Sequence, residues 1–132
     1  MTDTQRKIKE IDKAIEELRR KRRELEEIEK AEYLETAKAN VGRCFYNSKK
    51  KEYCKIIDVP QDEWTYDCKC IFTEEYYPVV IVYDEEIVPV QEDTLYLRNN
   101  LIEGFETEIT KEEFEKVLRK RFSGFFEDIL KI

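Results

Sequence analysis

The chain has 132 residues, of which 42% are charged and 41% hydrophobic, and its formal net charge is −7. The length fits one compact domain or a smaller domain with an appendage, and a content of three Gly and three Pro favours ordered helix and strand. The lack of histidine excludes Ser-His-Asp and Cys-His catalysis as well as His-ligated zinc. We therefore expect a non-enzymatic protein with no catalytic residues and no cofactor.

The N-terminal residues lead into a charged pattern and not into the apolar segment of a secretory signal. No run of about 18 apolar residues is present that would span a bilayer. A cytoplasmic protein without a membrane partner is indicated. The four cysteines are then expected to be reduced thiols, because disulfides need an oxidising compartment.

Residues 2–40 contain no Gly or Pro and consist mostly of strong helix formers. Thr2 and Gln5 have the spacing of a capping box, in which each side chain pairs with an amide of the first helical turn. We predict one long helix over residues 1–40, about 55 Å in length. The remaining residues 41–132 are expected to form a small α+β domain, from which the N-terminal half of the helix projects.

This helix carries a stripe of large aliphatic residues with the heptad spacing of a coiled coil. A projecting helix with such a stripe needs a partner, so we expect a homo-oligomer joined through the helix. Two chains are the default, an Ile-rich seam also permits three or four, and pairing with a different chain is left open. The predicted oligomerisation residues are Ile8, Ile11, Ile15, Leu18, Arg22 and Leu25.

The densest basic run, residues 19–23, has the charge to grip phosphates and the helical setting to lie in the major groove of DNA. Glutamates three and four residues away favour instead a solvated face whose charges pair along the helix. Direct DNA binding is therefore not favoured.

Beyond Gly42 the pattern changes to short strands separated by polar turns. Residues 43–46 and 52–57 flank a polar turn and predict a β-hairpin. Residues 64–73 alternate and predict a third strand. Residues 76–83 and 87–90 predict a second hairpin, in which Pro78 and Pro89 favour edge or bulged positions because proline cannot donate to the ladder.

The C-terminal part of the chain is expected to return to helix. Residues 95–97 predict a short strand, and residues 102–106 a turn or short strand. Thr110 and Glu113 have capping-box spacing and open a helix that points Phe114, Val117 and Leu118 inward. Residues 125–130 close the chain with further apolar side chains. The predicted fold is thus α+β, with a long N-terminal coiled-coil helix, a small antiparallel β-sheet and a C-terminal helix.

Four thiolates could converge on zinc, because the hairpin turn predicts that Cys44 and Cys54 lie nearly opposite each other, while Cys68 and Cys70 share one face of a strand. The sequence lacks the short Cys-x-x-Cys knuckles of zinc ribbons and fingers. Ordinary buried thiols are favoured and no metal site is predicted, although zinc binding is left open.

The negative charge is concentrated in residues 72–110, which hold ten acidic residues and one basic residue, Arg98. Such a segment is either a solvated face or a surface for a basic partner. Tyrosines on strands pack across the sheet, and an exposed subset can anchor an interface. The predicted partner-binding residues are Asp84, Glu85, Glu86, Glu92, Asp93, Tyr76 and Tyr77.

A nucleotide is the alternative ligand, because aromatic side chains can stack a base while nearby cations meet phosphate. Cross-strand packing of the same aromatic residues, without any ligand, is the simpler interpretation. For a nucleotide held between subunits, the candidate residues are Arg43, Lys55, Trp64, Tyr66 and Arg98.

Residues 41–46 (VGRCFY), 53–58 (YCKIID) and 108–114 (EITKEEF) resemble segments of small bacteriophage and prophage proteins of unknown function. The resemblance covers most of the chain and carries no catalytic or binding residue. It implies a viral setting, in which small acidic proteins often bind and disable a host enzyme or immune factor. We therefore expect an anti-defence inhibitor that binds a host protein stoichiometrically in the host cytoplasm. The alternatives are a sponge for a signalling nucleotide and a structural or assembly protein.

Overall fold

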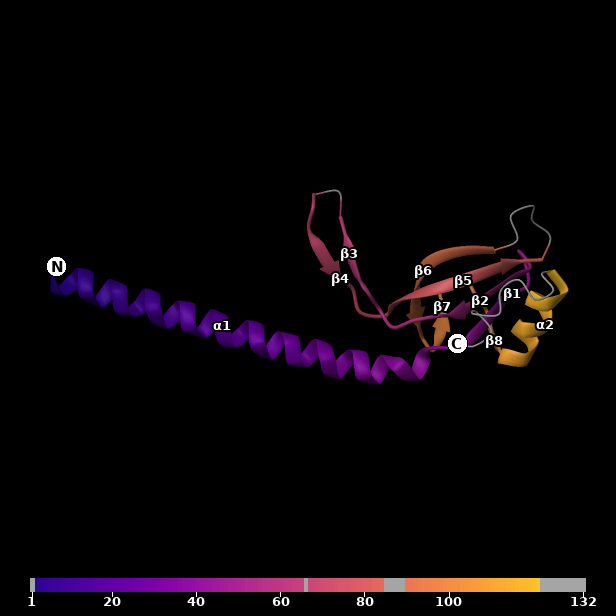
Figure 1. The fold of residues 1–132 in the computed structure, drawn as a ribbon, viewed down its shortest axis with the longest axis horizontal. Coiled ribbons are helices and arrows are strands. Elements are labelled where there is room, and N and C mark those ends of the chain that lie inside the picture. Colours follow the sequence, from indigo (N-terminus) through magenta and orange to yellow (C-terminus); the bar gives the residue numbers. More distant parts are fainter. Residues whose placement is uncertain (1, 66, 85–89, 122–132) are drawn as a thin grey trace. The chain divides into compact units, whose positions relative to one another are not determined.

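The computed structural model describes residues 2–65, 67–84 and 90–121. The chain divides into two compact units, Met1–Thr36 and Ala37–Ile132. The first unit is helical, and the second is built mainly of antiparallel strands (Figure 1). The predicted α+β class is confirmed, with its long N-terminal helix, antiparallel sheet and C-terminal helix. Pro89 and the predicted closing residues 125–130 lie outside the described residues.

Helix α1 spans Asp3–Ala37, and one turn of 3-10 helix, η1 (Lys38–Asn40), follows it. The predicted capping box is formed: the N–H of Gln5 donates to Oγ1 of Thr2 at 3.1 Å, and the N–H of Thr2 donates to Oε1 of Gln5 at 2.9 Å. Gly42 has a φ of 92°, a left-handed conformation in which the chain leaves the helical segment. None of the helices in the described ranges is both long and apolar enough to cross a membrane.

Six strands form one antiparallel sheet in the order β7-β6-β5-β2-β1-β8, and β3 and β4 form a separate two-stranded hairpin. Neighbouring strands are mostly consecutive in sequence, whereas β8 returns to pair with β1 at the far edge. The strands of the large sheet are β1 (Cys44–Asn47), β2 (Glu52–Ile56), β5 (Tyr76–Tyr83), β6 (Val90–Arg98), β7 (Leu101–Ile102) and β8 (Thr107–Ile109).

The predicted hairpin of residues 43–46 and 52–57 is formed by β1 and β2. Strand β5 matches the predicted residues 76–83 and pairs with the strand that follows it, but β6 shares only Val90 with the predicted return strand 87–90, whose other residues lie outside the described ones. Strand β6 is longer than predicted, because it includes residues 95–97, which were expected to form a strand of their own. It turns into β7 at Asn99 and Asn100, whose φ values of 53° and 65° are typical of a two-residue type I′ turn.

The prediction of one strand over residues 64–73 is wrong, because the chain reverses there. Strand β3 (Asp62–Trp64) pairs with β4 (Cys70–Phe72). In the turn between them, the N–H of Thr65 donates to the carbonyl of Lys69 at 2.8 Å, and Cys68 has a φ of 57°. This turn contains neither Gly nor Pro, and Asp67 is its one residue of a type enriched in turns, so the composition signal for a reversal is weak.

Pro78 lies inside the sheet, on β5 between β2 and β6, so the prediction of an edge or bulged strand is wrong for this residue. Its carbonyl accepts a hydrogen bond from the N–H of Ile57 at 3.0 Å, and the reciprocal bond is absent because proline has no N–H. The β2–β5 ladder ends next to it, at the pair Ile56–Val79. The missing donor therefore falls at the end of the ladder and interrupts no interior pairing.

Helix α2 (Lys111–Arg121) packs on one face of the sheet, here named the helix face. Its predicted capping box is formed, since the N–H of Glu113 donates to Oγ1 of Thr110 at 3.1 Å. Phe114 and Leu118 are buried, as predicted. They form one hydrophobic cluster with the strand residues Cys44, Val80 and Val82.

The opposite face of the sheet is buried as well. Side chains alternate along a strand, so every second residue points to the helix face and the residues between them point to the opposite face. Burial on both faces explains the nearly continuous apolar run of β5. The fully buried residues of this face include Phe45, Cys54, Ile56, Tyr77 and Val79.

Candidate functional site

The aliphatic stripe of α1 is open to solvent in the single chain. Its large side chains are between 41% and 65% exposed. Arg22, the charged residue in the predicted seam, is also exposed, and its Nε donates to Oε1 of Glu26 at 3.0 Å. All predicted oligomerisation residues therefore lie where a second helix can cover them. The exposed aliphatic residues of α1 are Ile8, Ile11, Ile15, Leu18, Leu25 and Ile28.

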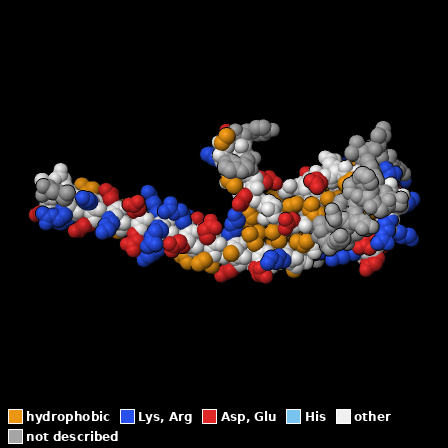
Figure 2. Space-filling view, in the orientation of Figure 1, with side chains coloured by type: hydrophobic (Ala, Val, Ile, Leu, Met, Phe, Trp, Pro, Cys, Tyr) orange, Lys and Arg blue, Asp and Glu red, His pale blue; other side chains and the backbone are white. Residues whose placement is uncertain are grey.

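The basic run of α1 pairs with glutamates of the same helix, as predicted. Arg20 contacts Glu24 at 3.2 Å and Glu17 at 4.0 Å, and Lys21 also contacts Glu17 at 4.0 Å. Figure 2 shows charged side chains of both signs along α1. Exposed pairs at these spacings contribute only about 0.3–0.5 kcal/mol each. These charged side chains therefore keep the helix surface hydrophilic but add little to its stability.

The predicted partner-binding residues do not share one surface. Glu92 and Asp93 are both exposed on β6, but Glu92 pairs with Val80 of the helix face and Asp93 with Val79 of the opposite face. Asp84 is half-buried after the end of β5. Glu85 and Glu86 lie outside the described residues. Glu92 and Asp93 therefore point to different sides of the sheet.

The two tyrosines of the predicted partner surface have different environments. Tyr76 is 41% exposed, and its ring centroid lies 4.9 Å from that of Tyr96 on the neighbouring strand. Tyr77 is only 1% exposed, and its hydroxyl accepts a hydrogen bond from Nδ2 of Asn40 at 2.9 Å. Assigning Tyr77 to a partner surface is therefore wrong, because its side chain belongs to the core of the second unit.

Exposed polar groups surround a hollow of about 270 Å³ between the β3–β4 hairpin and the β5–β6 strands. Glu63 of the hairpin accepts a hydrogen bond from the hydroxyl of Thr94 on β6 at 3.2 Å, which links the two parts. The exposed Glu92 lies two residues before Thr94, on the same face of β6. The hollow is lined by Gln61, Glu63, Thr73, Tyr76 and Thr94.

Of the residues that line the hollow, Tyr76 was predicted to bind a partner, whereas Gln61, Glu63, Thr73 and Thr94 were not. Gln61, Glu63 and Thr73 lie on or next to the β3–β4 hairpin, whose reversal the sequence analysis did not predict, whereas Thr94 comes from β6. The hollow presents a carboxylate and an aromatic wall, a combination that suits a cationic side chain such as Arg or Lys.

The residues predicted to hold a nucleotide do not form one site within the chain. Arg43 precedes β1 and pairs with Ile56, whereas Lys55 pairs with Cys44, so the two cations point to opposite faces of the sheet. Arg98 is exposed at the end of β6. The side chain of Trp64 and all of Tyr66 lie outside the described part of the chain. Nucleotide binding between subunits remains a prediction.

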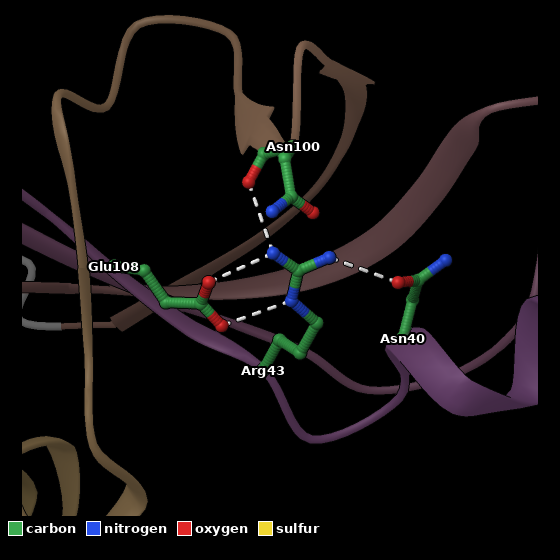
Figure 3. Close-up of polar contacts among 4 residues, drawn as sticks. All are labelled: Asn40, Arg43, Asn100 and Glu108. Atoms are coloured by element: carbon green, nitrogen blue, oxygen red, sulfur yellow. Dashed lines mark hydrogen bonds and ion pairs between the residues drawn. The ribbon is translucent and has the colours of Figure 1, made fainter.

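Arg43 instead joins parts of the second unit that are distant in sequence (Figure 3). Its Nε and Nη2 donate to the two carboxylate oxygens of Glu108 at 2.9 and 2.8 Å. Nη2 also donates to the carbonyl of Asn100, and Nη1 to Oδ1 of Asn40, both at 2.9 Å. Because Glu108 belongs to β8 and Asn100 precedes β7, one guanidinium links the two edge strands of the sheet.

The four cysteines do not converge. Cys44 pairs with Lys55 and Cys54 pairs with Phe45, so the prediction that the two thiols lie nearly opposite is wrong by one residue of register, and they point to opposite faces. Both are buried, and burial raises the pKa of the Cys44 thiol to about 12, which keeps it protonated and unreactive. Cys68 and Cys70 are exposed on the β3–β4 hairpin. Within the described ranges, no three Cys, Asp or Glu side chains gather as a metal site.

Lys55 is fully buried on the helix face, with its Nζ 5.8 Å from the centroid of the Phe114 ring. Burial lowers the pKa of its ammonium group. Because the unfolded chain then binds the proton more tightly, stability rises with pH until the unfolded pKa of about 10.4 is passed.

We expect Lys55→Met to raise the free energy of unfolding by about 1 kcal/mol at pH 7, because no charge is then transferred from water into the core. The free energy of unfolding of the variant is also expected to rise less between pH 7 and pH 10, because the variant lacks the ammonium group of Lys55. Thermal unfolding of both proteins between pH 7 and pH 10 measures this. A lower melting temperature for Lys55→Met at pH 7 would show that the buried ammonium group is stabilising.

Comparisons with protein-family models, curated proteins and solved structures found no match for this chain. The predicted phage setting therefore stays a prediction. The two candidate binding surfaces of the chain are the α1 stripe and the hollow lined by Glu63 and Tyr76.

Proposed function

We propose that the protein is a non-enzymatic binding protein whose α1 joins copies of the chain and whose second unit binds a protein target. The finer proposal is a phage-encoded inhibitor that disables a host defence factor by stoichiometric binding. The resemblance to phage proteins supports this setting, and the two surfaces described above support the binding role.

The observation that carries the proposal is the exposed stripe of α1. Burying a large aliphatic side chain is worth about 1.5–3 kcal/mol, and α1 leaves six of them between 41% and 65% exposed. The net charge of residues 1–40 is zero, with eleven basic and eleven acidic residues, so a second copy meets no overall repulsion. A second copy of α1 offers the same stripe and covers it.

The hollow beside β6 supports a target with a basic surface. Glu63 supplies a carboxylate, Tyr76 an aromatic face, and Glu92 a second exposed charge on the same face. An arginine or lysine of the target would gain both an ion pair and a cation–π contact there. Joining copies through α1 multiplies such contacts and raises the overall affinity without any new interaction.

The test starts from proteins captured by the purified, unmodified oligomer from a bacterial host extract. Each captured protein is then purified and titrated against the double variant Glu63→Gln Glu92→Gln. A matched control, Glu103→Gln Glu112→Gln, removes the same charge from exposed acidic residues elsewhere on the second unit.

A genuine target is expected to bind the unmodified protein and the control equally, and to bind the Glu63→Gln Glu92→Gln variant at least about tenfold more weakly. Its affinity should also fall as salt is raised from 50 to 300 mM, because screening weakens attraction between exposed charges. If every captured protein binds both variants alike and is insensitive to salt, the proposed target surface is wrong.

A further inference from the structure

We propose that α1 pairs with α1 of a second copy in the antiparallel direction, with Ile8 of one chain beside Leu25 of the other. This inference rests on the proposed self-association and adds its direction and register. The seam, the order of charges along α1 and the position of Arg22 all favour this arrangement.

The seam itself defines the register. Ile8, Ile15 and Arg22 occupy heptad position a, and Ile11, Leu18 and Leu25 occupy position d. In an antiparallel pair each a residue faces a d residue of the other helix. The facing pairs are then Ile8–Leu25, Ile15–Leu18 and Arg22–Ile11, and each pair occurs twice.

Sliding the second helix by one heptad makes the seam worse in either direction. One shift places Ile8 and Ile11 opposite Glu32 and Glu29. The other leaves Leu25 beyond the end of the opposite helix, which begins at Asp3. The proposed register therefore covers every a and d side chain from Ile8 to Leu25, within a stretch of α1 in which every side chain is exposed.

The order of charges along α1 favours the antiparallel direction. The helix consists of four successive charge blocks, which are residues 3–9 with net +2, residues 10–17 with −3, residues 19–23 with +5 and residues 24–29 with −4. In the proposed register, the first block faces the fourth and most of the second faces the third, so blocks of opposite net charge meet, with like-charged residues opposite each other only at Lys13–Arg20 and at the central Glu16–Glu17. A parallel pair would place each block against its own copy.

Arg22 gives a second reason. In a parallel pair the two Arg22 side chains would face each other within the seam, where like charges are costly. In the antiparallel pair Arg22 faces Ile11. The residue after Ile11 is Asp12, whose carboxylate can pair with the guanidinium of Arg22. Asp12 and Arg19, which flank the seam at position e, also face each other twice in this arrangement.

Flanking pairs alone would not decide the direction. A parallel pair would also bring Lys7 near Asp12 and Lys21 near Glu26. These are exposed pairs worth about 0.3–0.5 kcal/mol each. The seam position of Arg22 and the whole-block repulsion between residues 19–23 outweigh them.

The test is disulfide crosslinking in full-length protein that carries Cys68→Ser and Cys70→Ser, which removes the exposed thiols and leaves the buried Cys44 and Cys54. Two chains are prepared, Ile8→Cys and Leu25→Cys, and each is oxidised alone and after mixing by unfolding and refolding. Lys13→Cys, on the far side of α1, is mixed with Leu25→Cys as the control.

We expect the disulfide between Ile8→Cys and Leu25→Cys chains to form in at least tenfold higher yield than the disulfide between two copies of either variant. In the proposed register the two Ile8 positions are about 26 Å apart along the helix, far beyond the roughly 7 Å limit for a disulfide. Efficient crosslinking of Ile8→Cys alone would overturn the direction while leaving self-association intact. A monomeric mass with no crosslinks would instead overturn the proposed function itself.

A charge exchange gives an independent readout. Asp12→Arg is expected to raise the dissociation constant about tenfold, because it places two arginines together at position e, and adding Arg19→Asp is expected to restore it. In a parallel pair Asp12→Arg would face Lys7 and Arg19→Asp would face Ala14, so the second change would restore nothing. Failure of the double variant to recover therefore contradicts the antiparallel register.

Discussion

Replacing Ile11, Ile15 and Leu18 with glutamine is expected to convert the oligomer into monomers. These side chains are between 41% and 64% exposed in the single chain and form the centre of the proposed seam. Each is worth about 1.5–3 kcal/mol when buried, so losing them from both chains of a pair removes at least about 5 kcal/mol. The dissociation constant should therefore rise about a thousandfold or more.

The measurement is light scattering coupled to size exclusion over a range of protein concentrations. Glutamine is a good helix former, so the helix signal in circular dichroism at saturating concentration should separate loss of association from loss of α1. The control is Lys13→Gln Glu17→Gln Arg20→Gln, which changes three side chains away from the seam. A triple variant that keeps the mass of the unmodified oligomer would show that the stripe does not join the chains.

Arg43→Met is expected to have the second-largest effect, a loss of about 2–3 kcal/mol in the free energy of unfolding of the second unit. The guanidinium makes four hydrogen bonds, to Glu108, Asn40 and Asn100, and it lies 5.3 Å from the centroid of the Phe45 ring. The Arg43 side chain is only 18% exposed, whereas Glu108 is 42% exposed, so the ion pair itself supplies the smaller part.

For a unit of this size, such a loss lowers the melting temperature by roughly 10–20 °C. Near-ultraviolet circular dichroism of the tyrosines reports on the second unit, which holds all of them except Tyr33. Arg98→Met, at an exposed position on β6, is the matched control and is expected to change the melting temperature by only a few degrees. Equal effects of the two substitutions would show that Arg43 does not hold the sheet edges together.

The contribution of Arg43 should also depend on pH. The hydrogen bond from the Arg43 guanidinium lowers the pKa of the Glu108 carboxyl below the usual value, although burial of the carboxyl acts in the opposite direction. A carboxylate with a lowered pKa stabilises the fold above its unfolded pKa of about 4.3, and this stability is lost as the pH falls through the folded value. The difference in melting temperature between the unmodified protein and Arg43→Met should therefore shrink between pH 6 and pH 3. A difference that stays constant would assign the whole effect to the neutral contacts.

The parts of the fold that sequence predicts are those fixed by neighbouring residues. Both capping boxes, Thr2 with Gln5 and Thr110 with Glu113, form because their partners lie three residues apart. The pairing of residues 19–23 with glutamates of the same helix follows from the same local geometry. The hairpin β1–β2 is also local, because a short polar turn joins its two strands.

The parts that sequence did not predict depend on register and on distant contacts. A shift of one residue in the β1–β2 ladder moves Cys44 and Cys54 to opposite faces, and no pattern in either strand fixes that shift. Arg43 finds Asn100 and Glu108 at separations of 57 and 65 residues. The Asn99–Asn100 turn, by contrast, carries a recognisable type I′ signal that the strand prediction did not use.

The candidate site divides in the same way. The stripe of α1 is visible in the sequence because heptad spacing is local, whereas the hollow lined by Glu63 and Tyr76 depends on where the β3–β4 hairpin lies against β5 and β6. Tyr76 and Tyr77 illustrate the difference within one strand. Adjacent residues point to opposite faces, so composition alone could not separate the exposed tyrosine from the buried one.

Native mass spectrometry of the unmodified protein, without added metal or ligand, tests the central claim most directly. A single antiparallel pair predicts a complex of twice the chain mass of 16.0 kDa, with no additional mass. A complex that retains the mass of a nucleotide would favour the sponge over the protein-binding inhibitor. A single chain at every concentration up to about 100 μM, well above the micromolar range of specific association, would contradict the account, because the aliphatic stripe of α1 would then have no second copy to cover it.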